Sequence, residues 1–435
     1  MHNMNKPRLI PALIALAFSG TASAAGFQLL EQNASGLGNA YAGSAAVAEN
    51  ASTIFFNPAG MTQLQAREVS LGGTIVQTNF EFTDSGSSVG RLAGTGDGGN
   101  GGSTGFIPNA YMSWALSNDW YVGFGLGAPF GLRTEYNDVW VGAAQSRSFD
   151  IKTINLNPSV AWRATDWVSL GFGLNWQRVE AEYIRTVGTG STLSGATAVF
   201  PASTVKLTLD DDSWGWNAGA LFKLAPATKL GVSYRSAIKY DTTGKTETTG
   251  PSAALNAGGS VNANASIKMP DSLILSLAQG VGDRVELLGD VSWTGWSSIP
   301  KVDIVRTSGA ASGTIAQTLE TDFRDTWRFA VGANYKLDEA FKLKFGLAYD
   351  QTPVKNAEHR LTSLPDNDRT WFSAGVQWKP SKTTALDVGA AYLYVKDTQI
   401  NNDQRSTDQT KNRGLVKGTY EDSAFLLGAQ FSMAF

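Results

Sequence analysis

The chain has 435 residues, a formal net charge of −3, two histidines and no cysteine. The lack of cysteine excludes a disulfide framework and a thiolate metal site. A mildly acidic chain has too little clustered positive charge for phosphate backbones, so we expect no nucleic-acid partner. The length exceeds that of a usual single core, so we expect either several domains or one large closed sheet.

The first residues have the composition of a secretory signal peptide. Lys6 and Arg8 precede an apolar run over residues 9–18, and the small residues 22–24 fit a signal-peptidase site. We therefore predict a signal peptide over residues 1–24, which leaves 435 − 24 = 411 residues with a net charge of −5. No run of 18 or more apolar residues occurs, so we expect no helical membrane span. A membrane location would then require a β-barrel.

Strict alternation of apolar and polar residues is the strongest pattern in the rest of the chain. Between residues 167 and 176, the apolar residues Val168, Leu170, Phe172, Leu174 and Trp176 share one face. Similar runs begin at residues 120, 327 and 341. A soluble sandwich also alternates, but its polar face would be rich in Lys and Glu rather than Gly and Ser. Aromatic residues end these apolar runs, as lipid–water interfaces select, so the pattern favours a membrane barrel.

Short turns alternate with long polar segments along the sequence. The long segments cover residues 84–104, 133–146, 186–204, 242–266, 297–314, 352–368 and 398–418. Bacterial outer-membrane barrels have short periplasmic turns and long extracellular loops, so seven long loops predict about fourteen strands. We therefore predict an all-β fold, a 14-stranded antiparallel transmembrane β-barrel over residues 67–435, with both chain ends on the periplasmic side.

The stretch that precedes the first predicted strand differs from the strands. A barrel of this size has a lumen too wide for its own side chains to fill. Residues 25–66 contain only two charged side chains, Glu31 and Glu49. We predict that these residues fold inward as a partly helical hatch that plugs the lumen. Gly36 and Gly38 permit tight turns and close packing, and Pro58 is expected to limit any helix to the residues before it.

Four stretches are specific enough to compare with a known family. They are the predicted mature start AGFQLLEQNASGLGNAYAG, the triplet Asn57-Pro58-Ala59, the run LNPSVAWR, and the run SLPDNDRTWFSAG over residues 363–375. Together they resemble the FadL family of outer-membrane transporters for long-chain fatty acids and other hydrophobic compounds. The resemblance covers nearly the whole predicted mature chain. It implies a 14-stranded barrel closed by an N-terminal hatch, with Asn57, Pro58 and Ala59 at the gate.

The resemblance also implies a passive route. Ligand would be captured among the loops and pass to a deeper pocket, and a hatch rearrangement would lead it to a lateral gap at a kink in the third strand. Here the third strand would begin at Trp120, and Ala128, Pro129, Phe130 and Gly131 interrupt it. Proline cannot donate to a ladder, so a break in pairing is expected there. The alternative is that Pro129 merely ends the strand near the barrel rim.

The resemblance places the family's ligand-contacting arginine at Arg185, where it would bind a ligand carboxylate. The family's partner lysine falls near Leu319 and the neighbouring acidic position at Thr321, so half of this clamp is missing. We predict a long-chain fatty acid as the ligand, with aromatic or aliphatic hydrocarbons as the alternative. A purely solvated role for Arg185 at the strand end also stays open.

No pattern in the sequence indicates an enzyme, a metal or a cofactor. We expect Asp366, Asp368 and Arg369 to anchor a loop through ion pairs, and no phosphate-binding loop or metal-ligand spacing occurs. A lipid hydrolase in the barrel would need a base for its serine, and His359 is the only histidine after residue 24. A general porin conflicts with the predicted hatch, and a purely structural or adhesive barrel is a further alternative. The expected partners are a hydrophobic ligand, outer-membrane lipid and lipopolysaccharide, and we expect a monomer.

Overall fold

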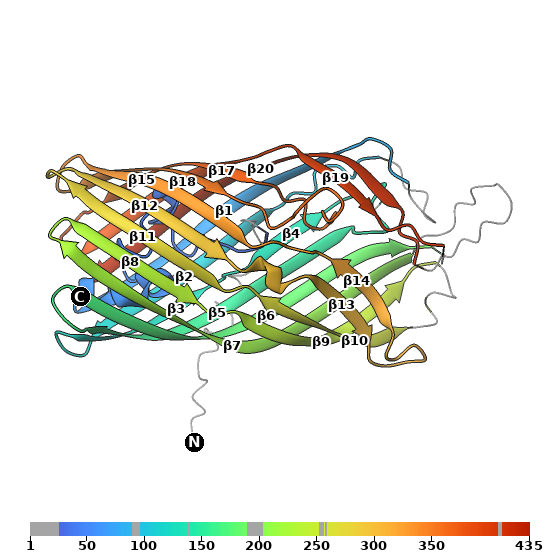
Figure 1. The fold of residues 1–435 in the computed structure, drawn as a ribbon, viewed down its shortest axis with the longest axis horizontal. Coiled ribbons are helices and arrows are strands. Elements are labelled where there is room, and N and C mark those ends of the chain that lie inside the picture. Colours follow the sequence, from blue (N-terminus) through green and yellow to red (C-terminus); the bar gives the residue numbers. More distant parts are fainter. Residues whose placement is uncertain are drawn as a thin grey trace, which may run out of the picture.

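The fold is a closed barrel of antiparallel strands (Figure 1). The computed structural model describes residues 26–88, 96–137, 139–188, 203–251, 256, 259–407 and 411–435. The predicted signal peptide therefore lies outside the described residues. Four short helical segments are present in the described part of the chain: η1 (Leu37–Asn39), α2 (Thr53–Phe56), η2 (Pro58–Gln63) and η3 (Trp296–Ser298). None of the described helices is long and apolar enough to cross a membrane.

Twenty strand segments make up the sheet. In chain order they are β1 (Arg67–Asp84), β2 (Thr104–Ala115), β3 (Trp120–Gly127), β4 (Gly131–Glu135), β5 (Ser148–Arg163), β6 (Val168–Val187), β7 (Ser203–Ala225), β8 (Thr228–Arg235), β9 (Ile238–Thr249), β10 (Ser260–Met269), β11 (Ser272–Val281), β12 (Val285–Thr294), β13 (Lys301–Arg306), β14 (Ile315–Glu320), β15 (Thr326–Lys336), β16 (Phe341–Asp350), β17 (Arg369–Trp378), β18 (Thr384–Val395), β19 (Thr398–Asp403) and β20 (Leu415–Ala434).

These segments correspond to fourteen spans of the barrel wall. Six spans consist of two segments each, so twenty segments give 20 − 6 = 14 spans; the pairs are β3/β4, β8/β9, β10/β11, β12/β13, β14/β15 and β18/β19. The first strand β1 pairs antiparallel with β2 on one side and with the last strand β20 on the other, which closes the sheet. The predicted 14-stranded antiparallel barrel is confirmed.

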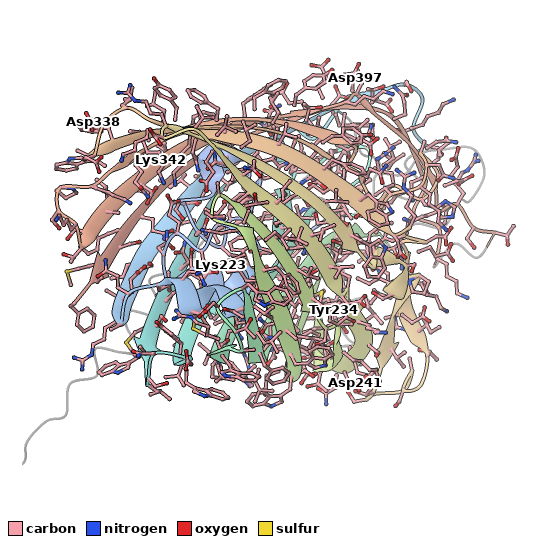
Figure 2. The ribbon with its side chains drawn as sticks, turned by 60° about the vertical axis from the view of Figure 1, so that its left-hand side comes forward. Lys223, Tyr234, Asp241, Asp338, Lys342 and Asp397 are labelled. Carbon is pink, nitrogen blue, oxygen red and sulfur yellow. The ribbon has the colours of Figure 1, made fainter. Side chains whose placement is uncertain are left out.

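The burial of side chains is inverted relative to a soluble protein. In β6 the apolar residues Leu170, Phe172 and Leu174 point outward and are 42–47% exposed, whereas Ser169 and Asn175 are buried inside. An outward apolar band of this kind is what a bilayer requires. The C-terminus lies at the end of the barrel that carries the short turns (Figure 1). Figure 2 shows Asp338 near one end of the barrel, and Asp397 lies part-way along it, between β18 and β19.

Several segments predicted as loops are strands. Residues 242–249 belong to β9, residues 260–266 to β10, residues 301–306 to β13 and residues 398–403 to β19. The strands continue beyond the apolar band, where outward-facing side chains meet water instead of lipid. Those segments therefore lack the apolar alternation on which strand prediction depends, and the loop prediction was wrong for them.

The N-terminal segment (residues 26–66) lies inside the barrel wall, where Figure 1 draws it in dark blue. Its backbone touches glycines on the inner face. A Cβ atom at Gly346 would lie 2.1 Å from the carbonyl carbon of Asn39, and one at Gly231 would lie 2.0 Å from the Ala45 oxygen. Glycine at these wall positions is therefore required by close approach. The helix α2 ends at Phe56, before Pro58, as predicted. Pro58 also begins the helix η2, which was not predicted, because its missing N–H costs nothing at a first helical position.

Candidate functional site

An apolar cavity of about 850 Å³, its open side included, lies inside the barrel next to the N-terminal segment. Its wall is built from alternate inward-facing residues of strands β5, β6, β7, β9, β10, β13 and β14, and Phe27 contributes from the N-terminal segment. None of the described residues that line it carries a charge. Representative lining residues are Ile151, Val179, Leu209, Ala265, Val302 and Leu319. We call this space the inner cavity.

A second space adjoins the inner cavity on the side away from the N-terminal segment. It measures about 990 Å³ with its open mouth included, and Arg185 and Arg306 are among its lining residues. Both spaces are lined by Tyr183, Leu207 and Ile304. Side chains two residues apart in a strand point to the same face. Arg185 follows Tyr183 by two residues in β6, and Arg306 follows Ile304 by two residues in β13, so both arginines face inward as well. We call this space the outer hollow and the three shared residues the neck.

The residues expected to bind the ligand divide between these two spaces. Arg185 lines the outer hollow and donates from Nε to Gln317 Oε1 at 3.1 Å. Leu319 and Thr321 line the inner cavity, and Thr321 Oγ1 donates to the carbonyl oxygen of Ile299. The inner cavity is therefore uncharged at the positions where the family would carry charge, and Arg185 lies in the adjoining outer hollow.

The third span is interrupted where the sequence predicts it. Strand β3 ends at Gly127 and β4 begins at Gly131. Strand β3 pairs with β2 only over residues 110–115 of β2, and β4 pairs with β5 but not with β2. Residues 104–109 of β2 therefore have no ladder on this side among the described residues, and this stretch includes Pro108, which could not donate to one. The predicted break in pairing is present, and Ala128 and Phe130 are buried.

The N-terminal segment supplies the missing partners of the interruption. Leu29 N–H donates to the carbonyl oxygen of Pro129 at 2.7 Å, and Gly131 N–H donates to that of Phe27 at 2.8 Å. These two bonds frame an antiparallel bridge between Gln28 and Phe130. The kink in the wall is thus completed by a short strand-like piece of residues 27–29. Sequence reasoning predicted the kink but missed this pairing.

Gln32 binds the kink with its side chain. Its Nε2 donates to the carbonyl oxygens of Ala128 at 2.8 Å and Leu29 at 3.1 Å, and its Oε1 accepts from Ala128 N–H at 3.1 Å. The sequence offered one signal for this contact, because an amide in a segment predicted to plug the lumen must find hydrogen-bond partners there.

The Asn57-Pro58-Ala59 triplet is a buried link between the N-terminal segment and the wall. Asn57 Nδ2 donates to the carbonyl oxygens of Ala45 at 2.7 Å and Ala220 at 3.0 Å, while its Oδ1 accepts from Ala59 N–H at 3.1 Å. Pro58 and Ala59 are buried beside it. These contacts fix two turns of the segment to each other and to β7.

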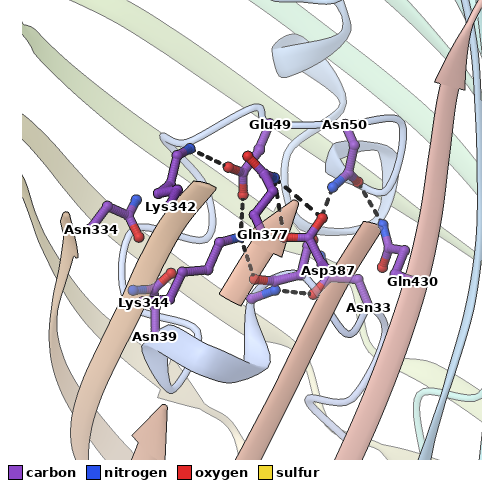
Figure 3. Close-up of polar contacts among 12 residues, drawn as sticks. Asn33, Asn39, Glu49, Asn50, Asn334, Lys342, Lys344, Gln377, Asp387 and Gln430 are labelled. Carbon is purple, nitrogen blue, oxygen red and sulfur yellow. Dashed lines mark hydrogen bonds and ion pairs between the residues drawn. The ribbon is translucent and has the colours of Figure 1, made fainter. Parts of the chain in front are cut away.

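A buried ion network holds the middle of the N-terminal segment (Figure 3). Lys344 Nζ lies 2.6 Å from Glu49 Oε2 and 2.8 Å from Asp387 Oδ1, and Lys342 Nζ lies 2.6 Å from Glu49 Oε1. The side chains of Lys344 and Asp387 are only 2% exposed. Although burial opposes ionisation, the two lysines lower the pKa of Glu49 below its ordinary value. Sequence analysis noted Glu49 but did not find this network.

The predicted ion-pair network of residues 366–369 exists and reaches the N-terminal segment. Arg369 pairs with Asp366, Arg324 Nη2 lies 3.7 Å from Asp368 Oδ1, and Gly26 N–H donates to Asp366 Oδ2 at 2.9 Å. His359 lies apart in the loop, with its Nε2 3.9 Å from Asp322 Oδ2. No group of three or more residues that could hold a metal occurs in the described part of the chain.

Glu31 is the buried carboxyl group without a hydrogen-bond partner in this segment. It is 1% exposed, and neither oxygen has a partner in the described structure. Burial raises the pKa of Glu31 to about 7, against the weaker lowering effects of its own backbone N–H and of Arg369 and Arg328, and Asp350 adds to the rise. A protonated Glu31 is therefore the form that favours the docked segment at residues 26–32.

The family model described as Outer membrane protein transport protein (OMPP1/FadL/TodX) matches residues 15–435. The chain belongs to this family. It is 31% identical to Outer membrane protein P1 of Haemophilus influenzae, covering 93% of this chain and 94% of that one. It is 29% identical to the Long-chain fatty acid transport protein of Escherichia coli K12, covering 97% of each. A crystal structure of a Pseudomonas aeruginosa FadL homologue has the same fold, with a TM-score of 0.84 at 22% identity, covering 94% of this chain and 99% of that one.

Membership of the family assigns the chain to the bacterial outer membrane and to transporters of hydrophobic compounds. The short turns then face the periplasm and the long loops face outward, as in other barrels of this membrane. The outer hollow is therefore on the external side of the inner cavity.

Replacing Lys344 should destabilise the protein. Lys344→Met leaves Asp387 buried without a cation, and breaking a buried pair in this way costs about 3–5 kcal/mol in the free energy of unfolding. Lys301→Met is the matched control because its pair with Asp303 is exposed, and its cost should stay below about 1 kcal/mol. Guanidinium titration followed by tryptophan fluorescence measures both, and equal losses would contradict a role for burial.

Docking of residues 26–32 should weaken as the pH rises. The docked state raises the pKa of Glu31 above its ordinary value of 4.5, so the stabilisation is full below 4.5 and is lost as the pH rises to about 7. A spin label at Leu30→Cys should become more mobile between pH 5 and pH 8. Glu31→Gln should remove most of this dependence, and an unchanged dependence in that variant would assign the effect to another group.

Proposed function

We propose that this protein takes up long-chain fatty acids passively across the outer membrane. The observation that carries the proposal is a continuous arrangement: an outer hollow with arginines, an apolar neck, an uncharged inner cavity, and a kink in the wall that the N-terminal segment covers. The carboxylate would bind at Arg185, and the alkyl chain would pass the neck into the inner cavity. Burial of each CH₂ group stabilises such a complex by about 0.8 kcal/mol.

Phe27 connects the cavity with the exit in this proposal. Its ring lines the inner cavity, while its carbonyl oxygen accepts the hydrogen bond from Gly131 N–H. A ligand that displaces Phe27 therefore also breaks the pairing that completes the kink at Ala128, Pro129, Phe130 and Gly131. Lateral exit into the bilayer would follow between β2 and β4, where no ladder joins the two strands.

The rest of the predicted hatch would act as the fixed part of the gate. We propose residues 25–66 as the hatch and residues 67–435 as the barrel, since β1 begins at Arg67. Asn57, Pro58 and Ala59 would hold the hatch in register with β7, and the Glu49 network would hold it against β16 and β18. Only residues 26–32 make their contacts with the kink itself.

Aromatic or aliphatic hydrocarbons are the second candidate ligands. The observation in their favour is the uncharged lining of the inner cavity, including Leu319 and Thr321 at the positions where the resemblance implied charged residues. Such ligands would use the same neck and the same exit without needing Arg185.

Arg185→Gln should separate the two ligand classes. It should weaken oleate binding at least tenfold, because a hydrogen bond between charged groups is worth about 1.5–3 kcal/mol, and leave toluene binding unchanged. Arg405→Gln is the control because Arg405 already pairs with Asp403 on the surface. Binding is measured with purified protein in lipid nanodiscs, and equal losses for both ligands would refute the carboxylate assignment.

A reversible disulfide tests the lateral exit. Gln28 and Phe130 face each other in the antiparallel bridge, so Gln28→Cys/Phe130→Cys can form a disulfide in a chain that has no other cysteine. Oxidation should block fatty-acid uptake by cells while binding persists, and reduction should restore uptake.

The matched control for this lock is Ser70→Cys/Ser432→Cys, whose hydroxyl oxygens lie 3.0 Å apart across the β1–β20 ladder. That disulfide should leave uptake unchanged. Full uptake by the oxidised Gln28/Phe130 pair would refute an exit through the kink.

A further inference from the structure

Three arginine side chains gather around the outer hollow. Arg185 and Arg306 line it, and Arg413 approaches from the residues just before β20. All three attach to β14 and the residue before it through neutral acceptors: Arg185 Nε to Gln317 Oε1 at 3.1 Å, Arg306 Nη1 to Thr314 Oγ1 at 3.1 Å, and Arg413 Nη2 to the carbonyl oxygen of Ala316 at 3.3 Å.

A β-bulge shapes this part of the wall. In the β13–β14 ladder Ile304 lies opposite Gln317, but Val305 lies opposite Ile315, so Ala316 is left without a partner. Bulges leave one residue unpaired and re-aim nearby side chains, and they are common beside functional sites. Here the extra residue, Ala316, accepts a hydrogen bond from Arg413 at its carbonyl oxygen. On the opposite strand β13, Arg306 is the residue that follows Val305.

Basic side chains on the outer face of this wall have carboxylate partners, whereas the three arginines on the inner face have none among the described residues. On the outer face of the same strands, basic side chains are paired with carboxylates: Lys206 with Glu182 at 2.6 Å, Arg178 with Asp210 at 2.6 Å, and Lys245 with Glu247 at 2.7 Å. On the inner face, Arg185, Arg306 and Arg413 form no ion pair with any described carboxylate. Three positive charges therefore gather at the entrance to an apolar cavity, and no carboxylate of the described residues pairs with them.

We propose that Arg185, Arg306 and Arg413 form a binding site for a doubly charged anionic head group, so that the protein takes up alkyl phosphate monoesters in preference to monocarboxylates. The inference rests on the proposed uptake function, and it adds two residues, Arg306 and Arg413, that the family resemblance does not supply. The phosphate binds in the outer hollow, and the alkyl chain passes the neck into the inner cavity.

The charge balance favours a dianion over a carboxylate. A fatty acid neutralises one of the three guanidinium groups, whereas a phosphate monoester near neutral pH carries a charge of about −1.5 to −2 and offers three acceptor oxygens. Planar guanidinium groups bind such oxygens with paired N–H donors. The geometry also supplies donors from three directions, since the arginines come from β6, from β13 and from the residues before β20.

The test compares three twelve-carbon probes on the full-length protein in lipid nanodiscs at pH 7.5: dodecyl phosphate, dodecanoate and 1-dodecanol. Dodecyl phosphate should bind at least tenfold more tightly than dodecanoate, because it engages additional charged hydrogen bonds. Arg306→Gln and Arg413→Gln should each reduce this preference, and the double variant should bring the two anions within about threefold of each other. Arg405→Gln serves as the surface control and should change nothing.

Binding of 1-dodecanol reports whether the cavity of each variant is intact, and it should stay constant throughout. Equal binding of the two anions by the unaltered protein, or a phosphate preference that survives in the double variant, would overturn the inference while leaving fatty-acid uptake standing. Failure of all three probes to bind the unaltered protein would overturn the proposed function and this inference together.

Discussion

The structure depends on one constraint: backbone N–H and C=O groups inside a bilayer must find partners within the protein. A closed barrel meets it by pairing β1 with β20, but the interruption between β3 and β4 leaves groups that no neighbouring strand can pair. Residues 27–32 of the N-terminal segment satisfy them, through Phe27, Leu29 and Gln32. The interrupted span and the folded segment in the lumen therefore depend on each other, because each supplies hydrogen-bond partners to the other.

The same constraint explains why so many polar groups are buried in the lumen. The N-terminal segment has few regular elements, so its backbone must be satisfied by side chains of the wall, as Asp290 does for Gly43 and Ser276 does for Ala45. The Glu49–Lys344–Asp387 network adds charge to this attachment. Buried ion pairs contribute little net stability, but a displaced one is costly, so they fix one position of the segment.

Much of the fold could be predicted from the sequence, because alternation within the apolar band is a local property. The number of spans and the position of β1 followed from such local signals, whereas the kink at Pro129 followed from the family resemblance together with the missing N–H of proline. The strands beyond the band, such as β13, could not be predicted because both of their faces are largely polar. The pairing of Phe27 with Gly131 and the meeting of Arg306 with Arg413 join residues more than a hundred positions apart. No periodicity records contacts of that kind, so this part of the candidate site had to come from the structure.

The two spaces in the lumen differ in what they can hold, and the neck makes that difference useful. Polar head groups are stabilised only in the outer hollow, because Leu319 and Thr321 leave the inner cavity without charge. On the proposed route an amphiphile would enter tail first, and its head group would limit its depth as long as Arg185 and Arg306 retain it. Progress toward Phe27 would then require the head group to leave these arginines, and this step would cost most free energy for the most strongly bound head groups. In this proposal tight capture and rapid release oppose each other at the neck, and the number of arginines around the outer hollow would set the balance between them.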